Sequence, residues 1–155
     1  MQHHNKNRAF SLLELLIVIT VIAILIGVLL PNLNEARIKA RDQRRKADIR
    51  SIIQSLETYK LNQSPPSYPA SSPFTAVGEA WVVGGVTYMN VIPSDPLYLT
   101  DTTNYIYRYY RDPVDSLKYY VGSCLEDVND PEAELSPPSD PGWSGCTYWY
   151  YRNEP

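Results

Sequence analysis

The hydrophobic pattern begins with a long apolar run near the N-terminus. Residues 10–30 are apolar except for Ser11, Glu14, Thr20 and Gly27. As a helix with a rise of about 1.5 Å per residue, this run would be about 31 Å long. That length matches the hydrocarbon core of a bilayer, which is about 30 Å thick. The pattern therefore predicts a transmembrane helix over residues 10–30.

The helical pattern continues beyond Pro31 as an amphipathic stretch. Its stripe follows the i, i+3, i+4, i+7 spacing of one helix face and comprises Ile49, Ile52, Ile53, Leu56, Tyr59 and Lys60. Pro31 removes a backbone donor and crowds the preceding turn, so we expect a helix kink at Pro31 rather than an end. One helix of about 50 residues results, with its amphipathic half over residues 31–61.

A change of composition follows the helix. Residues 62–74 are rich in Pro and Ser and predict a surface connection. Two apolar runs, residues 80–83 and 86–91, then flank Gly84-Gly85. Paired glycines tolerate the positive φ angles of a two-residue turn, so the pattern predicts a β-hairpin.

Two further strands are predicted in the same head, which we define as residues 62–155. Residues 105–109 alternate Tyr-Ile-Tyr-Arg-Tyr, and residues 118–124 read as a returning strand. A long helix followed by antiparallel strands indicates an α+β fold in which a small antiparallel sheet packs on the helix and a loop closes the C-terminus.

Charge divides the chain at the same place. Residues 10–60 hold eight bases and five acids, whereas residues 61–155 hold four bases and twelve acids. Nucleic-acid backbones are bound through Lys and Arg, so the acidic head argues against nucleic-acid binding. Seven of the bases lie in residues 37–50. They form either a solvated helix face with local ion pairs or a belt that contacts acidic surfaces of other copies of the chain.

Catalytic patterns are missing from the sequence of the head. Both histidines, His3 and His4, lie near the N-terminus, so a Ser/His or Cys/His nucleophilic site cannot form in the head. Neither a GxGxxG nor a P-loop pattern occurs in the sequence. We therefore expect a protein that is not an enzyme and that needs no cofactor.

Glu14 is the one acidic residue of the apolar run. Acidic groups cost up to about 2.5–3.5 kcal/mol at the centre of a membrane helix. Glu14 therefore either rises to the headgroup region or requires a partner. A cleaved secretory signal peptide is the less favoured interpretation, because its apolar region spans only about 7–15 residues and ends in a small-residue cleavage site, which residues 31–37 do not offer.

The sequence RAFSLLEL at residues 8–15 resembles the prepilin cleavage motif of type IV pilins and type II secretion pseudopilins. The shared features are a short basic leader, a small residue, Phe, and Glu at the fifth position after the cut. Ala9 stands where that family usually has Gly. The resemblance implies that a prepilin peptidase removes the leader, residues 1–9, between Ala9 and Phe10.

The resemblance also implies roles for three residues. Phe10 would become the N-methylated first residue. Glu14 would pair with the Phe10 amine of a neighbouring subunit, which makes two charges tolerable in hydrocarbon and selects a register. Pro31 lies where the family commonly bends its helix.

The resemblance implies that the protein is a structural subunit, a pilin or pseudopilin, of a type IV filament. A pseudopilus like that of type II secretion is the favoured filament. The expected partners are other copies in a helical homopolymer, the prepilin peptidase, an assembly ATPase and an inner-membrane platform protein. The expected location is the cytoplasmic membrane, with the head outside the cytoplasm, and later a periplasmic or extracellular filament. The bases after the span favour the opposite orientation by the positive-inside rule. The alternatives are a membrane-anchored module for glycans or cell wall and an anchored hydrolase.

Cys124 and Cys146 are the only cysteines, and both lie in the head. A disulfide between them would close a Pro-rich acidic loop and stabilise the fold by about 3 kcal/mol. Such a bond requires an oxidising compartment, which supports a head outside the cytoplasm. Two cysteines without a nearby histidine are too few for a zinc site.

A weaker resemblance to major pseudopilins covers residues 92–96 (Ile-Pro-Ser-Asp-Pro) and 119–126, although Leu97 replaces the usual Trp. Calcium binding in that group directs attention to the oxygen donors Glu126, Asp127, Asn129, Asp130, Glu132 and Glu134. Glu126, Asp127 and Asp130 are the weak metal candidates. Their spacing matches no EF-hand loop, so the sequence favours a solvated acidic loop without metal.

Overall fold

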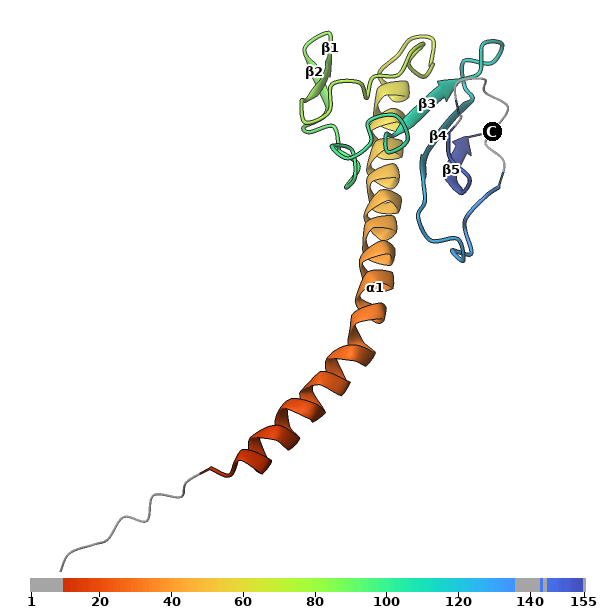
Figure 1. Cartoon of the computed structure of the whole chain (residues 1–155). Helices are drawn as coiled ribbons and strands as arrows, with labels where there is room; N and C mark the ends of the chain where they lie inside the picture. Colours follow the sequence, from red (N-terminus) through yellow and green to blue (C-terminus); the bar gives the residue numbers. More distant parts are fainter. Residues whose placement is uncertain (1–9, 136–142, 144, 155) are drawn as a thin grey trace, which may run out of the picture. The chain divides into compact units, whose positions relative to one another are not determined.

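The computed structural model describes residues 10–135, 143 and 145–154. Its elements follow one another along the chain (Figure 1) as α1 (Leu12–Leu61), β1 (Trp81–Val83), β2 (Val86–Met89), β3 (Arg108–Arg111), β4 (Tyr119–Cys124) and β5 (Trp149–Glu154). The chain divides into two compact units, Met1–Arg37 and Ile38–Pro155. This arrangement confirms the predicted α+β fold with one long helix and a small antiparallel sheet.

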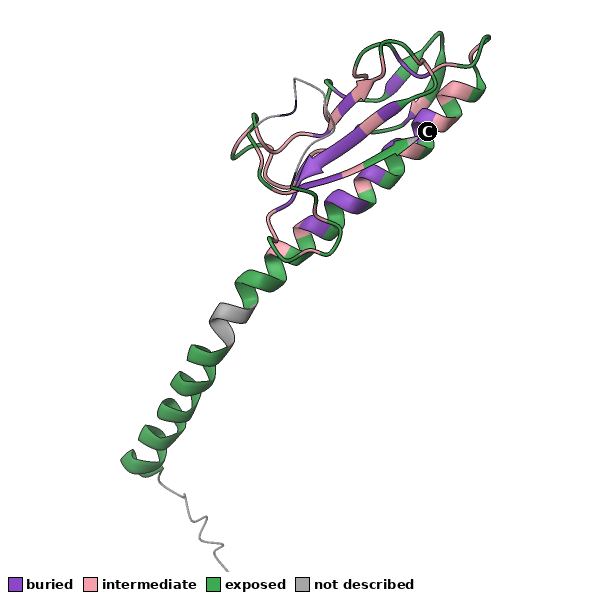
Figure 2. Ribbon diagram, turned by 90° about the vertical axis from the view of Figure 1, so that its right-hand side faces the viewer, coloured by how far each residue is buried: buried purple, intermediate pink, exposed green. Residues whose placement is uncertain are grey.

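The first unit holds the N-terminal part of α1. Ser11 caps this helix, because its Oγ accepts a hydrogen bond from the backbone N–H of Leu13 at 3.3 Å. The apolar side chains that follow are exposed, as the green N-terminal turns of Figure 2 show. By length and composition α1 can cross a membrane. At 50 residues α1 confirms the predicted length, and it continues through Pro31; the predicted kink there stays a prediction.

The core of the second unit lies between α1 and the sheet formed by β3, β4 and β5. Ile49, Ile52 and Leu56 on α1 have no exposed surface, which confirms the predicted apolar stripe. Val121 and Tyr150 pack against this stripe from β4 and β5. Figure 2 shows the buried residues of α1 on the side of the helix that the sheet covers.

The three-stranded sheet has the order β3-β4-β5 and is antiparallel throughout. Tyr109 lies opposite Val121, and both are buried toward the core. On the other face Trp143 stacks on Trp149, with ring centroids 5.4 Å apart. Gly122 makes room for this stack, because a Cβ there would lie 2.9 Å from Cζ3 of Trp143.

Two predictions about this sheet need correction. The strand predicted at residues 105–109 begins three residues later, at Arg108. Tyr105 and Tyr107 contact α1 instead: Tyr105 lies over a guanidinium group of the helix, and the hydroxyl of Tyr107 donates to Asp48 at 2.6 Å. The chain also does not end in a loop alone, since β5 pairs with the whole of β4.

The separate hairpin of β1 and β2 confirms the turn predicted at Gly84-Gly85. Both glycines have positive φ angles, 59° and 82°. These angles suit the tight turn that joins strands of right-handed twist. Trp81 of β1 stacks on Tyr59 of α1, with ring centroids 5.3 Å apart, so the hairpin is anchored to the helix.

Candidate functional site

The described part of the predicted cleavage motif, residues 10–15, lies at the start of α1. Phe10 precedes the helix and is 74% exposed, while Ala9 and the rest of the leader lie outside the described residues. Glu14 occupies the first turn, where the helix dipole favours a negative charge. Its side chain is exposed, and in the described part of the chain it takes part in no ion pair. The described residues therefore give Glu14 no cationic partner.

A buried ion cluster fastens α1 to the head. The side chain of Arg45 has no exposed surface, and its Nε and Nη2 donate to the two carboxylate oxygens of Asp95 at 2.7 and 3.0 Å. Its Nη1 donates to Asp42 at 2.6 Å and to Glu126 at 2.7 Å. Arg41 adds two hydrogen bonds to Glu126, at 2.7 and 2.5 Å. Three segments, α1, the loop after β2 and the loop after β4, therefore meet at one guanidinium group.

A second group of charges holds the loop after β4 at residues 130–132. Lys46 Nζ donates to both oxygens of Asp130, at 2.6 and 2.8 Å, and to Glu132 at 2.8 Å. The side chain of Lys46 is 3% exposed and that of Asp130 is 8% exposed. Glu132 also accepts a hydrogen bond from Arg152 of β5. The loop is thus tied both to α1 and to the sheet.

The pKa values of these groups follow from the pairing. Burial alone would lower the pKa of Arg45, but its hydrogen bonds to Asp95 and Glu126 outweigh burial and raise that pKa. Burial would raise the pKa of Glu126, but hydrogen bonds from the two arginines hold it below its usual value. Burial also opposes the ionisation of Lys46 and Asp130, yet their mutual hydrogen bonds raise the first pKa and lower the second. All four groups therefore stay charged at neutral pH.

These contacts correct two interpretations of the sequence. The basic run at residues 37–50 is not uniformly a solvated face or an intermolecular belt, because Arg45 and Lys46 are buried against acids of the same chain. The loop after β4 is not simply a solvated acidic loop, because Glu126 and Asp130 are mostly buried. Among the other candidates, Asp127 accepts a hydrogen bond from the backbone N–H of Asn129.

The sequence contained a signal for this cluster. Asp42, Arg45, Ile49 and Ile52 recur at steps of three, four and three residues, so the charged pair lies on the same helix face as the buried stripe. A charge on an apolar stripe must find partners when the stripe is covered. The partners could not be read from the sequence, since Asp95 and Glu126 are 50 and 81 residues away from Arg45.

The two cysteines are joined at the end of β4. Cys124 and Cys146 form a disulfide with their Cα atoms 5.8 Å apart. The bond holds the chain that leads into β5 against the strand with which β5 pairs. It therefore closes the C-terminal part of the head.

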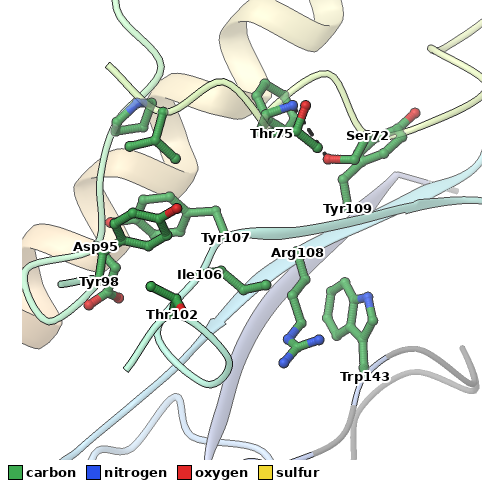
Figure 3. A pocket seen from close by; sticks show the side chains of 13 residues that line it. Ser72, Thr75, Asp95, Tyr98, Thr102, Ile106, Tyr107, Arg108, Tyr109 and Trp143 are labelled. Atoms are coloured by element: carbon green, nitrogen blue, oxygen red, sulfur yellow. Dashed lines mark hydrogen bonds between the residues drawn. The ribbon is translucent and has the colours of Figure 1, made fainter. Parts of the chain in front are cut away.

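A cavity of about 430 Å³ lies in the head beside β3. Rings of Tyr98, Tyr107 and Trp143 line it (Figure 3). Two of its polar groups are already used within the chain, because Asp95 binds Arg45 and the hydroxyl of Tyr107 donates to Asp48. In the described residues no group of three or more His, Cys, Asp or Glu side chains is arranged to hold a metal ion. The cavity therefore shows neither an acid–base pair nor a metal site.

Comparison with known proteins finds the same family that the N-terminal motif resembles. A family model described as "Prokaryotic N-terminal methylation motif" matches residues 4–30. The type II secretion system core protein G of Klebsiella michiganensis is 33% identical over 108 residues, which cover 70% of this chain and 68% of that protein. The type IV wide pilus major component PilA4 of Thermus thermophilus is 31% identical over 116 residues, covering 61% of this chain and 88% of the relative.

Other relatives are matched over less of their length. The core protein G of Pectobacterium carotovorum is 32% identical over 108 residues, 70% of this chain and 62% of that protein. For the core protein G of Escherichia coli the identity is 35% over 72 residues, 46% of this chain and 48% of the relative. The matched region thus spans 48–62% of the length of these two relatives. No solved structure matches the chain.

Proposed function

Because this chain belongs to the family of type IV pilins and type II secretion pseudopilins, as its relatives of known name show, we propose that it is a structural subunit of a filament. A type II secretion pseudopilus is the favoured filament, since several relatives are named as core protein G of that system. The observation that carries the proposal is the methylation motif continued by a single 50-residue helix.

Processing is the first step that we propose. A prepilin peptidase cuts between Ala9 and Phe10, and the new amine of Phe10 is methylated. The position of Phe10 suits this step, because it lies ahead of the helix and is largely exposed. Ala9 is small, so it fits a peptidase pocket that excludes side chains.

Assembly is the second step. Before assembly α1 anchors the subunit in the cytoplasmic membrane with the head outside, and the disulfide fits that oxidising compartment. An assembly ATPase and a platform protein then move subunits from the bilayer into a helical bundle. Glu14 of the incoming subunit pairs with the Phe10 amine of its neighbour, and the pair fixes the axial register of the two helices.

We propose no catalytic activity. A hydrolase would need positioned carboxylates that are free to exchange protons or attack a substrate. In the head Asp95, Glu126 and Asp130 are instead held by arginine and lysine side chains. Their role is to hold the fold together.

The test is the chemical state of the N-terminus. The full chain is produced in a bacterial host with and without a prepilin peptidase, extracted from membranes, and examined by intact-mass measurement and N-terminal sequencing. With the peptidase we expect a chain that starts at methylated Phe10, and without it a chain that retains the leader. An Ala9→Gly variant, with the residue usual in the family, is the matched control and should be cut at least as completely. A chain that keeps the leader in both hosts, while the control is cut, would contradict the proposal.

A further inference from the structure

The loop after β4, residues 125–135, is where resemblance to major pseudopilins implies calcium. Calcium requires six to eight oxygen ligands, so the carboxylates of the loop must be free to turn toward one ion. We propose that the loop is closed by cations of the protein itself, Arg41, Arg45 and Lys46, in place of a calcium ion. The head therefore folds and stays folded without calcium, whether or not the protein forms a filament.

Both carboxylate oxygens of Glu126 are bound by arginine side chains. One of its oxygens accepts hydrogen bonds from Nε of Arg41 and Nη1 of Arg45, both at 2.7 Å. The other oxygen accepts from Nη2 of Arg41 at 2.5 Å. These are charge-assisted hydrogen bonds in the forked geometry that suits a guanidinium and a carboxylate. Both oxygens are therefore occupied by positive groups.

Asp42 fixes the backbone at the same end of the loop. Its oxygens accept hydrogen bonds from the backbone N–H groups of Glu126, at 3.1 and 3.2 Å, and of Asp127, at 2.8 Å. It also accepts from Arg45. The backbone at the start of the loop is thus held by a carboxylate of α1, a task that needs no metal.

The far end of the loop is held by Lys46. An ammonium group has three donors, and Lys46 Nζ makes three contacts, two with Asp130 and one with Glu132. The remaining oxygen of Glu132 accepts from Arg152. The ammonium thus bridges two carboxylates of the loop, as a bound cation would do.

Calcium and this ammonium exclude each other. Nζ of Lys46 lies 2.6–2.8 Å from the oxygens that an ion would have to bind. Calcium–oxygen distances are about 2.3–2.6 Å, so an ion on the same oxygens would lie within a few ångströms of a positive charge and be repelled strongly. Binding would require Lys46 to leave a site in which its side chain is 3% exposed. The donor set therefore does not fit calcium.

The first experiment uses the unmodified full chain in detergent. Its Tm is measured by tryptophan fluorescence in excess EGTA and in millimolar calcium, and calcium binding is measured by calorimetry. We expect no shift in Tm and no binding heat. A site filled at 100 times its Kd would add enough stability to raise Tm by about 10 °C or more. A rise of that size would overturn the proposal.

The second experiment changes the built-in cation. Lys46→Met leaves Asp130 and Glu132 without their ammonium partner, so we expect Tm in EGTA to fall by about 10 °C. Lys46→Arg keeps the charge and should retain more of the original Tm. Lys118→Met is the matched control, because Lys118 forms an exposed pair with Asp115 at 3.7 Å and its loss should leave Tm nearly unchanged. If Lys46→Met melts with the original protein, the ammonium does not hold the loop and the proposal fails.

Discussion

Arg45 and Glu14 are both charges on α1, but only Arg45 is paired within the described chain. Arg45 is enclosed by carboxylates from three segments of the second unit. Glu14 stands among exposed apolar side chains and has no ion-pair partner in the described residues. The same helix therefore carries one charge that the fold pairs and one that the described residues leave unpaired.

The difference between Arg45 and Glu14 distinguishes a charge that serves folding from one that we propose serves assembly. A buried charge without a partner is expensive, so a chain either supplies the partner itself or depends on another molecule for it. In the head the partners lie on the same chain, and the result is one stable unit. For Glu14, in the apolar segment, we propose that the partner comes from another subunit, so that Glu14 acts in assembly.

The largest effect is expected from a change at the open charge. Replacing Glu14 by Gln keeps the shape of the side chain and removes its charge, so a pair with a neighbouring amine is lost. A loss of 1.4 kcal/mol per contact changes an equilibrium about tenfold, and in hydrocarbon the loss should be greater. We expect filaments, counted by electron microscopy after shearing, to fall by more than about tenfold.

The matched control for this change is Glu35→Gln. Glu35 is an exposed glutamate of the same helix, beyond the apolar run. The Glu35→Gln variant should leave filament yield unchanged. Both variants should melt like the original protein, because neither residue lies in the core of the head. Equal filament yields for the two variants would remove the distinction between Glu14 and an ordinary surface acid.

The second effect concerns the satisfied charge. Arg45→Met removes the guanidinium and leaves Asp42 and Asp95 buried without it, which should cost about 3–5 kcal/mol of unfolding free energy. The neighbouring Arg44 is the control: its side chain is 62% exposed and lies 3.9 Å from Asp48. Arg44→Met should cost less than about 1 kcal/mol. Urea unfolding of the full chain, followed by tryptophan fluorescence, measures both, and equal losses would show that burial of the pair has no special weight.

The third effect concerns the contribution of the disulfide to the stability of the head. Reduction of the Cys124–Cys146 bond should cost about 3 kcal/mol of stability, as closure of a loop of this length does in the chain-entropy model. A variant with both cysteines replaced by Ala should show no further loss with reductant. Urea midpoints with and without reductant provide the measurement. An unchanged midpoint for the original protein would show that β5 is held by its strand pairing alone.

Local patterns explain which parts of this architecture the sequence predicted. The hairpin depends on Gly84-Gly85, and the helix stripe depends on spacing within a few turns, so both could be read directly. β5 was missed because Trp149, Tyr150 and Tyr151 follow one another without alternation of apolar and polar residues. Its register is set by pairing with β4, which no local pattern shows.

The candidate site divides in the same way. The motif around Phe10 and Glu14 is contiguous, so it could be recognised in the sequence. The ion cluster joins Arg45 to residues 50 and 81 positions away, and only the folded chain brings these together. The bases of residues 37–50 looked alike in the sequence, although burial makes Arg45 and Lys46 different from the exposed Arg44.

The smallest effect is expected from mild acid. The folded-state pKa values of Glu126, Asp130 and Glu132 are all lowered. Burial would raise the pKa of Glu126 and Asp130, but hydrogen bonds from Arg41 and Arg45 to Glu126, and from Lys46 to Asp130, outweigh burial. The pKa of Glu132 is lowered foremost by its hydrogen bond from Lys46. A carboxylate with a lowered folded pKa stabilises the fold above its unfolded pKa, about 3.9–4.3, and loses this contribution as the pH falls through the folded value. Arg45 and Lys46 stay protonated throughout this range.

Between pH 7 and pH 5 the unfolding free energy of the head should therefore change by less than about 1 kcal/mol, and the urea midpoint should stay nearly constant. At pH values below about 4 the midpoint should decrease. The sequence sharpens this expectation, because the only histidines are His3 and His4 in the leader, so the head has no imidazole that titrates in the upper range. Midpoints measured in steps of pH on the processed chain provide the test. A midpoint that stays constant down to about pH 3 would show that the carboxylates of the cluster ionise like exposed ones and that their ion pairs add no stability.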